Sequence, residues 1–449
     1  MPLSRLLPFA AGASAIVIAA ALAPKAGSAH SADPTFAEDV APIFYKNCTT
    51  CHRPGGLGPF SLLDYDSTTP KLAKIRGMVM SGRMPPWQAA GPRGVFRNDR
   101  RLTDQERDMI VRWVNSGAKP GDMTKLPTKP DYSVGWEIGT PDLVVRMPQE
   151  YVVPASGTIE YQYFEVPAGI TEEKWVQAIE IMPGAREVVH HVLVYARVPA
   201  APNAAPSSPA AAPAGARPAQ QPLFIRNRAH ALPDVPRRDS THPPPRQLGA
   251  LIGTTAPGTN VVEFPPGTAL RLRAGTVLTF QMHYTAHGHE MKDRSAVGFK
   301  FAKEVPAEEI HATAFYNGSL VIPAGARDVA VPAEITVTQP VKIWGLFPHT
   351  HLRGTRWQYT LAKPDSTSEM VLDVPRYDFN WQTYYLFATP LEIPAGTKLE
   401  SMAWYDNSAS NKDNPDPTIE VKWGDQTWEE MQYTGILYSV PGRRVRSTP

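Results

Sequence analysis

Proline content restricts the fold of this chain more than any other feature. There are 47 prolines among 449 residues, and a proline inside a helix removes a hydrogen bond and clashes with the preceding turn. From about residue 123, proline and glycine separate short alternating runs, which indicates strands joined by turns. We therefore expect most of the chain to be all-β. The predicted strands lie at 142–147, 160–166, 176–182, 188–194, 276–284, 335–338, 341–347, 357–361 and 398–405.

The length of this β region sets the number of domains. It is too long for one sandwich, so we expect two all-β sandwich (jelly-roll-like) domains, at 130–303 and 304–449. Residues 199–246 interrupt the first, and 24 of these 48 residues are alanine or proline. That composition cannot build a core and predicts a disordered or extended surface loop.

A net charge of +2 and an apolar fraction of 42% are typical of a soluble protein and do not indicate nucleic acid as a partner.

The N-terminus has the order of a secretory signal. Arg5 precedes an uncharged run at 6–23, and small residues end at Ala29, as in a cleavable signal peptide. We expect cleavage after Ala29, which gives a signal peptide at 1–29. The mature protein would then be periplasmic or secreted, with no stable membrane insertion. The alternative is an uncleaved anchor, because the uncharged run approaches the length of a membrane span.

The only two cysteines of the sequence share one motif. Cys48 and Cys51 lie in a C-x-x-C-H pattern that His52 completes. This spacing is typical of c-type haem attachment, in which both thiols form thioethers and the histidine ligates the iron. The alternative is a redox dithiol, which would make His52 accidental. A helix-like stretch at 36–44 precedes the motif, whereas a redox dithiol of the thioredoxin kind needs a strand–helix context.

A second axial ligand of the haem is expected downstream. The candidates are Met78, Met80 and Met84. We favour Met84, because the two prolines after it fix an extended loop from which a thioether can reach the iron. Met78 and Met80 fall in a helix-like run, where packing explains a methionine. A capping pattern at Thr103 opens a last helix. Residues 30–122 therefore resemble a small all-α class I cytochrome c domain.

Histidines on strand-like segments give the second chemical signal. His349 and His351 stand two residues apart, so on a strand both imidazoles point to one face and can reach one metal. His190 and His191 are adjacent, so sharing a metal requires a bulge or a strand end. His283 stands on a third such segment, and the alternative is that all five are surface or structural residues. No role is assigned to His230, His242, His287, His289 or His311.

Four segments in this order resemble the copper type II monooxygenases, the family of peptidylglycine α-hydroxylating monooxygenase and dopamine β-monooxygenase. Residues 189–193 read Val-His-His-Val-Leu, and residues 281–284 read Gln-Met-His-Tyr. Residues 349–352 read His-Thr-His-Leu, and residues 424–431 form an acidic segment that ends in methionine. Each motif alone is weak, but together they are fairly specific.

The resemblance implies two β-sandwich domains, each with one copper ion, that face each other across a solvent-filled cleft. The electron-storage copper would be bound by His190, His191 and His283. The oxygen-binding copper, and with it the catalysis, would depend on His349, His351 and Met431. Imidazole suits copper in both oxidation states, and a thioether softens a site towards Cu(I). Met402 is the runner-up thioether, although its strand context favours a core residue.

The sequence also departs from the family. Animal members are cross-linked by disulfides, which two cysteines in a haem motif exclude here. The peptide-amidating member has an arginine two residues before its His-Thr-His motif, and here that position is Phe347. That member also has an asparagine and a tyrosine at the second and fourth positions after its methionine ligand, and here those positions are Tyr433 and Gly435. The residues that hold the substrate carboxylate are therefore absent, and a glycine-extended peptide is not expected as substrate. Trp344 and Trp428, with Phe347 and Tyr433, suggest an apolar or aromatic pocket or, alternatively, core.

These signals combine into one expected function. An exported haem- and copper-dependent monooxygenase would hydroxylate a C–H bond of a small organic substrate with O₂. The fused haem would relay electrons from an exported donor to the copper pair. The alternative is an envelope electron-transfer or copper-binding protein without its own oxygenase activity. A thiol–disulfide enzyme would require that Cys48 and Cys51 escape haem attachment.

Overall fold

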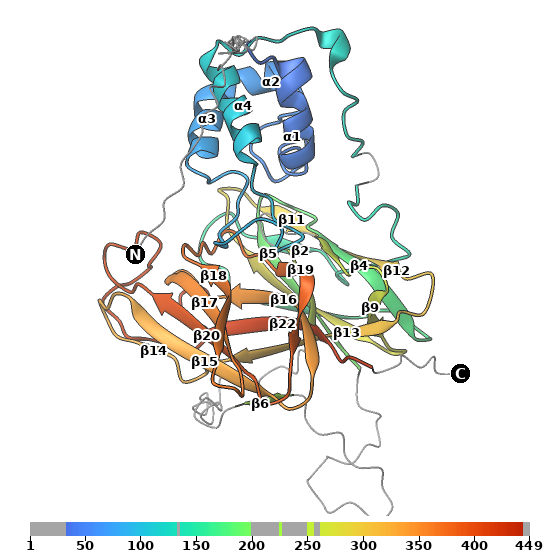
Figure 1. The fold of residues 1–449 in the computed structure, drawn as a ribbon, viewed down its shortest axis with the longest axis vertical. Helices are drawn as coiled ribbons and strands as arrows, with labels where there is room; N and C mark the ends of the chain where they lie inside the picture. Colours follow the sequence, from blue (N-terminus) through green and yellow to red (C-terminus); the bar gives the residue numbers. More distant parts are fainter. Residues whose placement is uncertain (1–32, 133–134, 199–223, 227–248, 256–260, 443–449) are drawn as a thin grey trace, which may run out of the picture.

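The computed structural model describes residues 33–132, 135–198, 224–226, 249–255 and 261–442. This part of the chain is mostly β-sheet with a few short helices, as expected for a sequence dominated by all-β sandwiches. Figure 1 shows the main helices gathered in a separate lobe above the strands. The predicted signal peptide at 1–29 and most of the predicted loop at 199–246 lie outside the described residues. Within those limits, no helix has the length and apolarity that crossing a membrane requires.

The helical lobe consists of short helices joined by turns. They are η1 (Phe36–Val40), α1 (Ala41–Asn47), α2 (Tyr65–Thr68), η2 (Thr69–Lys71), α3 (Leu72–Met80), α4 (Asp104–Asn115) and η3 (Met123–Lys125). The capping pattern predicted at Thr103 is confirmed. Its hydroxyl accepts a hydrogen bond from the Glu106 N–H at 3.0 Å, and the Glu106 carboxylate accepts one from the Thr103 N–H at 2.8 Å. This capping box satisfies N–H groups that the helix start leaves unpaired.

Aromatic side chains from the beginning and the end of the lobe's sequence form its core. Phe36, Phe44 and Trp113 are at most 1% exposed. The ring centroids of each pair lie 5.8–6.4 Å apart. Ile75 and Val79 of α3 pack against the same cluster. Burial of one such side chain contributes about 1.5–3 kcal/mol, so this contact holds η1, α1 and α4 together around the segment that carries the cysteine motif.

The β lobe contains the strands β1–β22, and each of the nine predicted runs overlaps one of them. Their bounds are β1 (Leu143–Arg146), β2 (Tyr151–Val153), β3 (Gln162–Pro167), β4 (Lys174–Met182), β5 (Val189–Arg197), β6 (Phe224–Arg226), β7 (Ala250–Thr255), β8 (Val261–Glu263), β9 (Thr268–Leu272), β10 (Val277–Tyr284), β11 (Met291–Asp293), β12 (Ala296–Phe301), β13 (Glu308–Tyr316), β14 (Val321–Ile322), β15 (Val329–Val337), β16 (Val341–His349), β17 (Gly354–Ala362), β18 (Ser368–Val374), β19 (Tyr385–Ile393), β20 (Lys398–Tyr405), β21 (Val421–Lys422) and β22 (Tyr433–Ser439).

One long sheet runs through the whole β lobe. Its strand order is β1-β12-β4-β9-β13-β22-β16-β19, and β8 also pairs with β4. A sheet of order β3-β10-β5-β7 and another of order β18-β17-β20-β15-β6 complete the main layers. One apolar core draws on β4, β5, β10 and β12, and a second draws on β15, β16, β17 and β20. Each core therefore lies between the long sheet and one smaller sheet, which is sandwich packing. The parallel pairing of β9 with β13 continues the long sheet from one half to the other.

One part of the predicted loop at 199–246 is a strand, so that prediction was wrong there. Phe224, Ile225 and Arg226 form β6, which pairs antiparallel with β15 at the edge of its sheet. Phenylalanine and isoleucine favour strands, and here they interrupt the alanine- and proline-rich composition. A strand at the edge of a sheet leaves its outer N–H and C=O groups without a strand partner, and a short edge strand such as β6 keeps that row short.

The segment between α3 and α4 leaves the helical lobe and packs on the second half of the β lobe. Trp87 and Phe96 are buried in the second apolar core, where both rings contact Tyr385, at 5.2 and 5.6 Å between centroids. Phe96 also forms an isolated antiparallel bridge with Phe387. We call residues 85–98 the strap. Because these side chains belong to the β core, the strap fixes the helical lobe to the strands.

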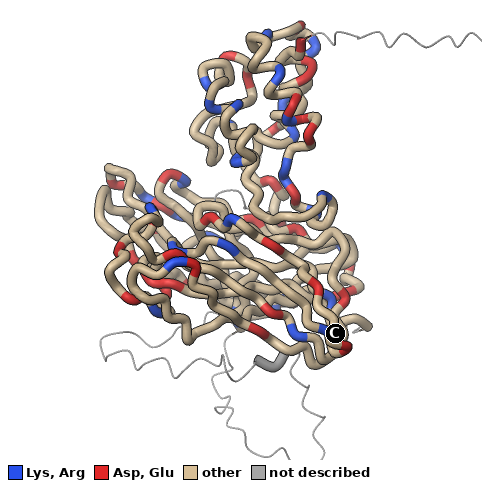
Figure 2. The backbone as a smooth tube through the Cα atoms, turned by 60° about the vertical axis from the view of Figure 1, so that its left-hand side comes forward, with Lys and Arg blue, Asp and Glu red and all other residues tan. Residues whose placement is uncertain are grey.

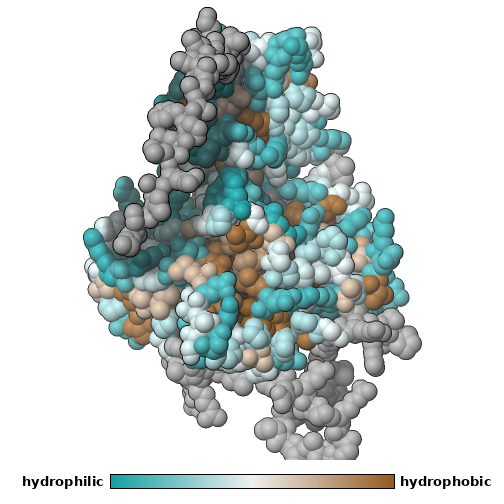
Figure 3. All heavy atoms as spheres, in the orientation of Figure 1, coloured by the Kyte–Doolittle hydropathy of each residue, from teal (hydrophilic) through white to brown (hydrophobic). Residues whose placement is uncertain are grey.

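Charged residues of both signs are mixed on the face of the two lobes that Figure 2 draws. Figure 2 shows Lys and Arg intermixed with Asp and Glu on both lobes. Figure 3 shows apolar side chains gathered in the middle of the β lobe, below the helical lobe. The face drawn in Figure 2 therefore has no extended basic patch of the kind that attracts a polyanion.

Candidate functional site

The structure brings three of the predicted ligands together in the first half of the β lobe. His190 and His191 of β5 and His283 of β10 offer nitrogen atoms that all lie within 4.8 Å of one another. The expected bulge is present: His283 pairs with His191, but Tyr284 pairs with Val189, so His190 is skipped. The extra residue turns His190 to the same side as its neighbour, and the adjacent histidines can share one metal.

Hydrogen bonds decide which nitrogen of each ring faces the centre of this first cluster. His190 donates from Nε2 to the Asn380 side-chain oxygen at 3.2 Å. Its Nδ1 lies 3.2 Å from the Nδ1 of His191. Among the described residues, the buried Nδ1 of His283 has no hydrogen-bond partner. One nitrogen of each ring therefore converges on a common point, and Asn380 orients His190 from outside, as hydrogen-bond partners do for metal-ligating histidines.

The second cluster lies where β16 ends. His349 and His351 are 4% and 0% exposed, and their ring centroids are 5.3 Å apart. His349 donates from Nδ1 to the Gln382 oxygen at 2.9 Å, and His351 donates from Nδ1 to the Glu429 carbonyl at 3.2 Å. The Nε2 of His351 is buried and has no partner in the described chain. Both rings are thus oriented through Nδ1, which leaves Nε2 as the ligand atom.

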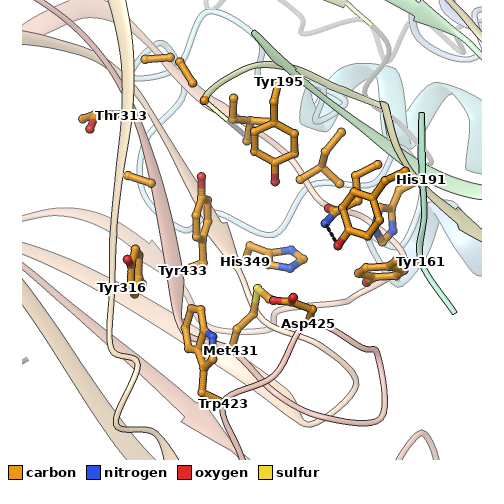
Figure 4. Close-up of a pocket in the computed structure, with 18 residues that line it drawn as sticks. Tyr161, His191, Tyr195, Thr313, Tyr316, His349, Trp423, Asp425, Met431 and Tyr433 are labelled. Atoms are coloured by element: carbon orange, nitrogen blue, oxygen red, sulfur yellow. Dashed lines mark hydrogen bonds between the residues drawn. The ribbon is translucent and has the colours of Figure 1, made fainter. Parts of the chain in front are cut away.

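A buried carboxylate joins this histidine segment to the methionine segment. Glu430 is fully buried and accepts hydrogen bonds from the backbone N–H groups of His351 (2.8 Å), Arg353 (2.7 Å) and Met431 (3.3 Å). Burial raises its pKa to about 8, against these stabilising hydrogen bonds. Figure 4 shows the Met431 sulfur pointing toward the His349 ring. The predicted second set, two imidazoles and one thioether, is therefore gathered in one place.

Burial keeps the imidazoles of both clusters neutral. It lowers the pKa of His283 to about 3, with a smaller contribution from His190, and that of His349 to about 4. The pKa values of His191 and His351 are also lowered, chiefly by burial. Neutral imidazole is the form that ligates a metal, so the clusters are ready for metal at physiological pH.

Two aromatic rings link the clusters. The Tyr161 ring lies 5.6 Å from His191, 5.0 Å from His283 and 6.5 Å from His351. Phe379 stacks on His190 at 5.0 Å and lies 6.2 Å from His351. These bulky side chains therefore occupy part of the space between the two sets of ligands, and the implied solvent-filled cleft stays a prediction.

A cavity of about 530 Å³ opens beside both clusters. His191 from the first cluster and His349 and Met431 from the second reach its wall (Figure 4). Tyr433 lines it as well, whereas Phe347 stacks behind His349 at 6.0 Å between ring centroids. Of the four residues that suggested an aromatic pocket, only Tyr433 lines the cavity, and the rest of its aromatic lining comes from side chains that no motif marked. They are Tyr161, Tyr163, Tyr195, Tyr316 and Trp423.

The cysteine motif forms one helical turn at the end of α1. His52 donates from Nδ1 to the Phe60 carbonyl at 3.1 Å, which orients the ring and leaves Nε2 as a ligand atom. A side chain at Gly58 would place its Cβ 2.5 Å from that nitrogen, so only glycine fits there. Burial raises the pKa of Cys48 to about 12 and also raises that of Cys51. A redox dithiol needs a lowered thiol pKa, so this environment does not favour a redox dithiol, and haem attachment stays a prediction.

The three methionines considered for the haem differ in their surroundings. Met84 is half-buried and follows the end of α3, where the Met84 and Arg83 N–H groups donate to the Met78 carbonyl. Met78 is half-buried as well, but Met80 is 55% exposed. Packing therefore does not explain Met80, contrary to expectation. Ligation of a haem iron by Met84 stays a prediction.

Known proteins offer no guide to the function. The chain matches no protein-family model. No curated protein sequence is significantly similar to it. Among solved structures, the major capsid protein P2 of bacteriophage PM2 is 9% identical, with a TM-score of 0.26 over 68% of this chain and 100% of that chain. A structure of infectious bursal disease virus strain Gx is 10% identical, with a TM-score of 0.17 over 71% of this chain and 76% of that chain. Likenesses this slight carry no argument.

Proposed function

We propose that this protein is an exported monooxygenase that uses a covalent c-type haem and two copper ions to hydroxylate a C–H bond of a small organic substrate. One observation carries the proposal: two sets of buried, neutral histidines, one with a methionine sulfur beside it, adjoin a single cavity. Neutral imidazole with thioether is a donor set suited to Cu(I), and a cavity beside it gives room for O₂ and substrate.

In this proposal each ligand has a defined role. Three nitrogens of the first cluster, the Nδ1 atoms of His190, His191 and His283, would hold the storage copper. The Nε2 atoms of His349 and His351, with the Met431 sulfur, would hold the oxygen-binding copper. The metals would supply the redox chemistry, and Gln382, Glu429 and Glu430 would keep the ligands in place through the hydrogen bonds described above.

The haem would be held by thioethers from Cys48 and Cys51, and His52 and Met84 would be the residues that ligate its iron. Hydroxylation converts R–H, O₂, two electrons and two protons into R–OH and water. A haem delivers electrons one at a time, so an exported one-electron donor would reduce it twice in each turnover. The strap supports this role, because it begins directly after Met84 and its residues Trp87, Ala89 and Phe96 are buried in the second β core.

The chain itself would control access to the reaction. The cavity is lined largely by tyrosines, by Trp423 and by small side chains such as Ala312 and Ala314. Such walls exclude water while aromatic faces bind a planar or apolar substrate. No substrate carboxylate clamp is expected, because Phe347 occupies the position of the arginine and is fully buried.

An electron-transfer protein without a substrate is the second candidate. The contacts of Tyr161 and Phe379 with both clusters favour it, because packed rings bring two metals into electronic contact without any substrate. The cavity beside Met431 argues for the oxygenase, since a relay has no use for an open position of that size.

Oxygen consumption by the fully reduced protein separates the two candidates. The full-length chain, matured with haem in an exporting host and loaded with copper, should consume O₂ and do so faster with apolar aromatic test substrates. Met431→Ala should abolish the stimulation by substrate. O₂ uptake that is unaffected by every test substrate and by Met431→Ala would leave the relay as the better description.

A further inference from the structure

A single loop of the second β half touches histidines of both clusters. It consists of residues 378–382, between β18 and β19. Asn380 accepts the hydrogen bond from His190 Nε2, and the Phe379 ring lies almost parallel to His190, at 15° and 5.0 Å. Gln382 accepts the hydrogen bond from His349 Nδ1. The loop therefore orients a ligand from each of the two metal sites.

The two ends of this loop are themselves bonded to each other. Gln382 is fully buried, and its amide nitrogen donates to the Phe379 carbonyl at 3.1 Å. A continuous path of contacts runs from His349 through Gln382 to Phe379 and on to His190. Because the Gln382 amide has its oxygen on one metal site and its nitrogen on the backbone beside the other, a shift at one end is transmitted to the other.

The strap of the helical lobe holds the chain on both sides of the loop. Before the loop, the Ala90 N–H donates to the Asp373 carbonyl at 2.8 Å. After the loop, the Asn98 side chain donates to the Tyr384 carbonyl at 2.6 Å and accepts from the Leu386 N–H at 3.1 Å. The loop is thus fixed at both ends by the segment that begins at the predicted haem ligand.

We infer that residues 378–382 couple the two metal sites, so that each site binds its metal more tightly when the loop is held by the other. Asn380 and Gln382 are positioning residues that act through His190 and His349. The inference rests on the proposed function insofar as both clusters must bind metal. Coupling of this kind is reciprocal: whatever one site gains from the other, the other gains in return.

The test measures Cu(I) binding in the full-length protein, in competition with a chromogenic chelator. First-site affinity is compared between the unmodified chain and His349→Ala with His351→Ala, in which Gln382 has lost its partner at the second site; it should be lower in the variant. Gln382→Ala in the otherwise unmodified chain should lower it as well, although Gln382 contacts none of the first-site histidines. Loss of the hydrogen-bond partner of a metal-ligating histidine lowers metal affinity by about 10- to 100-fold. Asn380→Ala removes the partner of His190 directly, so its loss of first-site affinity should fall in that range. The matched control is Gln177→Ala on β4, which should leave the affinity unchanged.

A second variant keeps the inference testable should Gln382→Ala fail to fold. Asn98→Ala removes two hydrogen bonds that hold the loop, and it should lower the Cu(I) affinity of both sites in the otherwise unchanged protein. Asn115→Ala, which removes an exposed bond to Arg76 on the helical lobe, is its control. Unchanged first-site affinity in Gln382→Ala, or in Asn98→Ala, would overturn the coupling. Absence of Cu(I) binding at both sites of the unmodified chain would overturn the proposed function instead.

Discussion

At the residue scale, the histidine side chains show how burial prepares a site. A buried imidazole loses hydration of its charged form, so its pKa falls. The values of about 3 for His283 and about 4 for His349 follow from that burial. An imidazole in the unfolded chain has a pKa of about 6.5. Between these pKa values, His283 and His349 are protonated in the unfolded chain and neutral in the folded protein.

This difference predicts a pH dependence of stability in the metal-free protein. As the pH falls through about 6.5, the unfolded state binds protons at these histidines while the folded state does not, so stability decreases. The melting temperature of copper-free protein should drop steadily from about pH 7 to about pH 5. His283→Gln should make the drop shallower. A melting temperature that stays flat over this range would contradict the burial of neutral imidazoles.

Met431 supplies the residue-scale test of the second site. A thioether prefers Cu(I), so Met431→Ala should weaken Cu(I) binding more than Cu(II) binding at His349 and His351. Copper in the first cluster should remain, because its ligands lie on β5 and β10. Met402→Ala is the control, since Met402 is half-buried on β20 and is not a lining residue of the cavity. Equal loss of both oxidation states would argue against a sulfur ligand.

At the scale of elements, strands and loops contribute differently to the site. The alternation of apolar residues predicted β5, β10 and β16, and therefore placed the predicted histidine ligands on strands or at their ends. A bulge and a strand end were the two ways in which the adjacent histidines could share a metal, and the structure has a bulge at His190. The loop at 378–382 and the strap carry no such pattern, because their partners lie far away in the chain. Asn380, for example, bonds to His190 across 190 positions.

The strap offers a test at this scale. Trp87 is 7% exposed and packs against Phe96 and Tyr385. Trp87→Ala should lower the free energy of unfolding by about 3–5 kcal/mol, as for other large aromatic residues in cores. Denaturant unfolding followed by circular dichroism measures this. Trp404→Ala, at a half-buried ring below the Arg356 guanidinium, should cost clearly less. Similar losses for both variants would mean that the strap is only loosely attached.

At the scale of the whole molecule, the sequence predicted the mostly β architecture and the histidines that gather in the two clusters. It did not predict that Tyr161 and Phe379 lie between the clusters, because those rings are brought in by segments without a motif. It also did not predict the parallel pairing of β9 with β13, which depends on long-range packing rather than on local pattern. The helical lobe, the strap and the two clusters are connected by contacts between segments that lie far apart in the sequence.

The copper and haem content of the mature chain tests this assembly most directly. Protein matured in an exporting host should contain two copper ions and one covalent haem per chain, measured by elemental analysis and by the haem absorption spectrum. Cys48→Ala with Cys51→Ala should remove the covalent haem and leave both coppers, because the clusters lie in the β lobe. His190→Ala should leave the haem and one copper. A chain that binds haem but fewer than two coppers, or copper without covalent haem, would contradict the account.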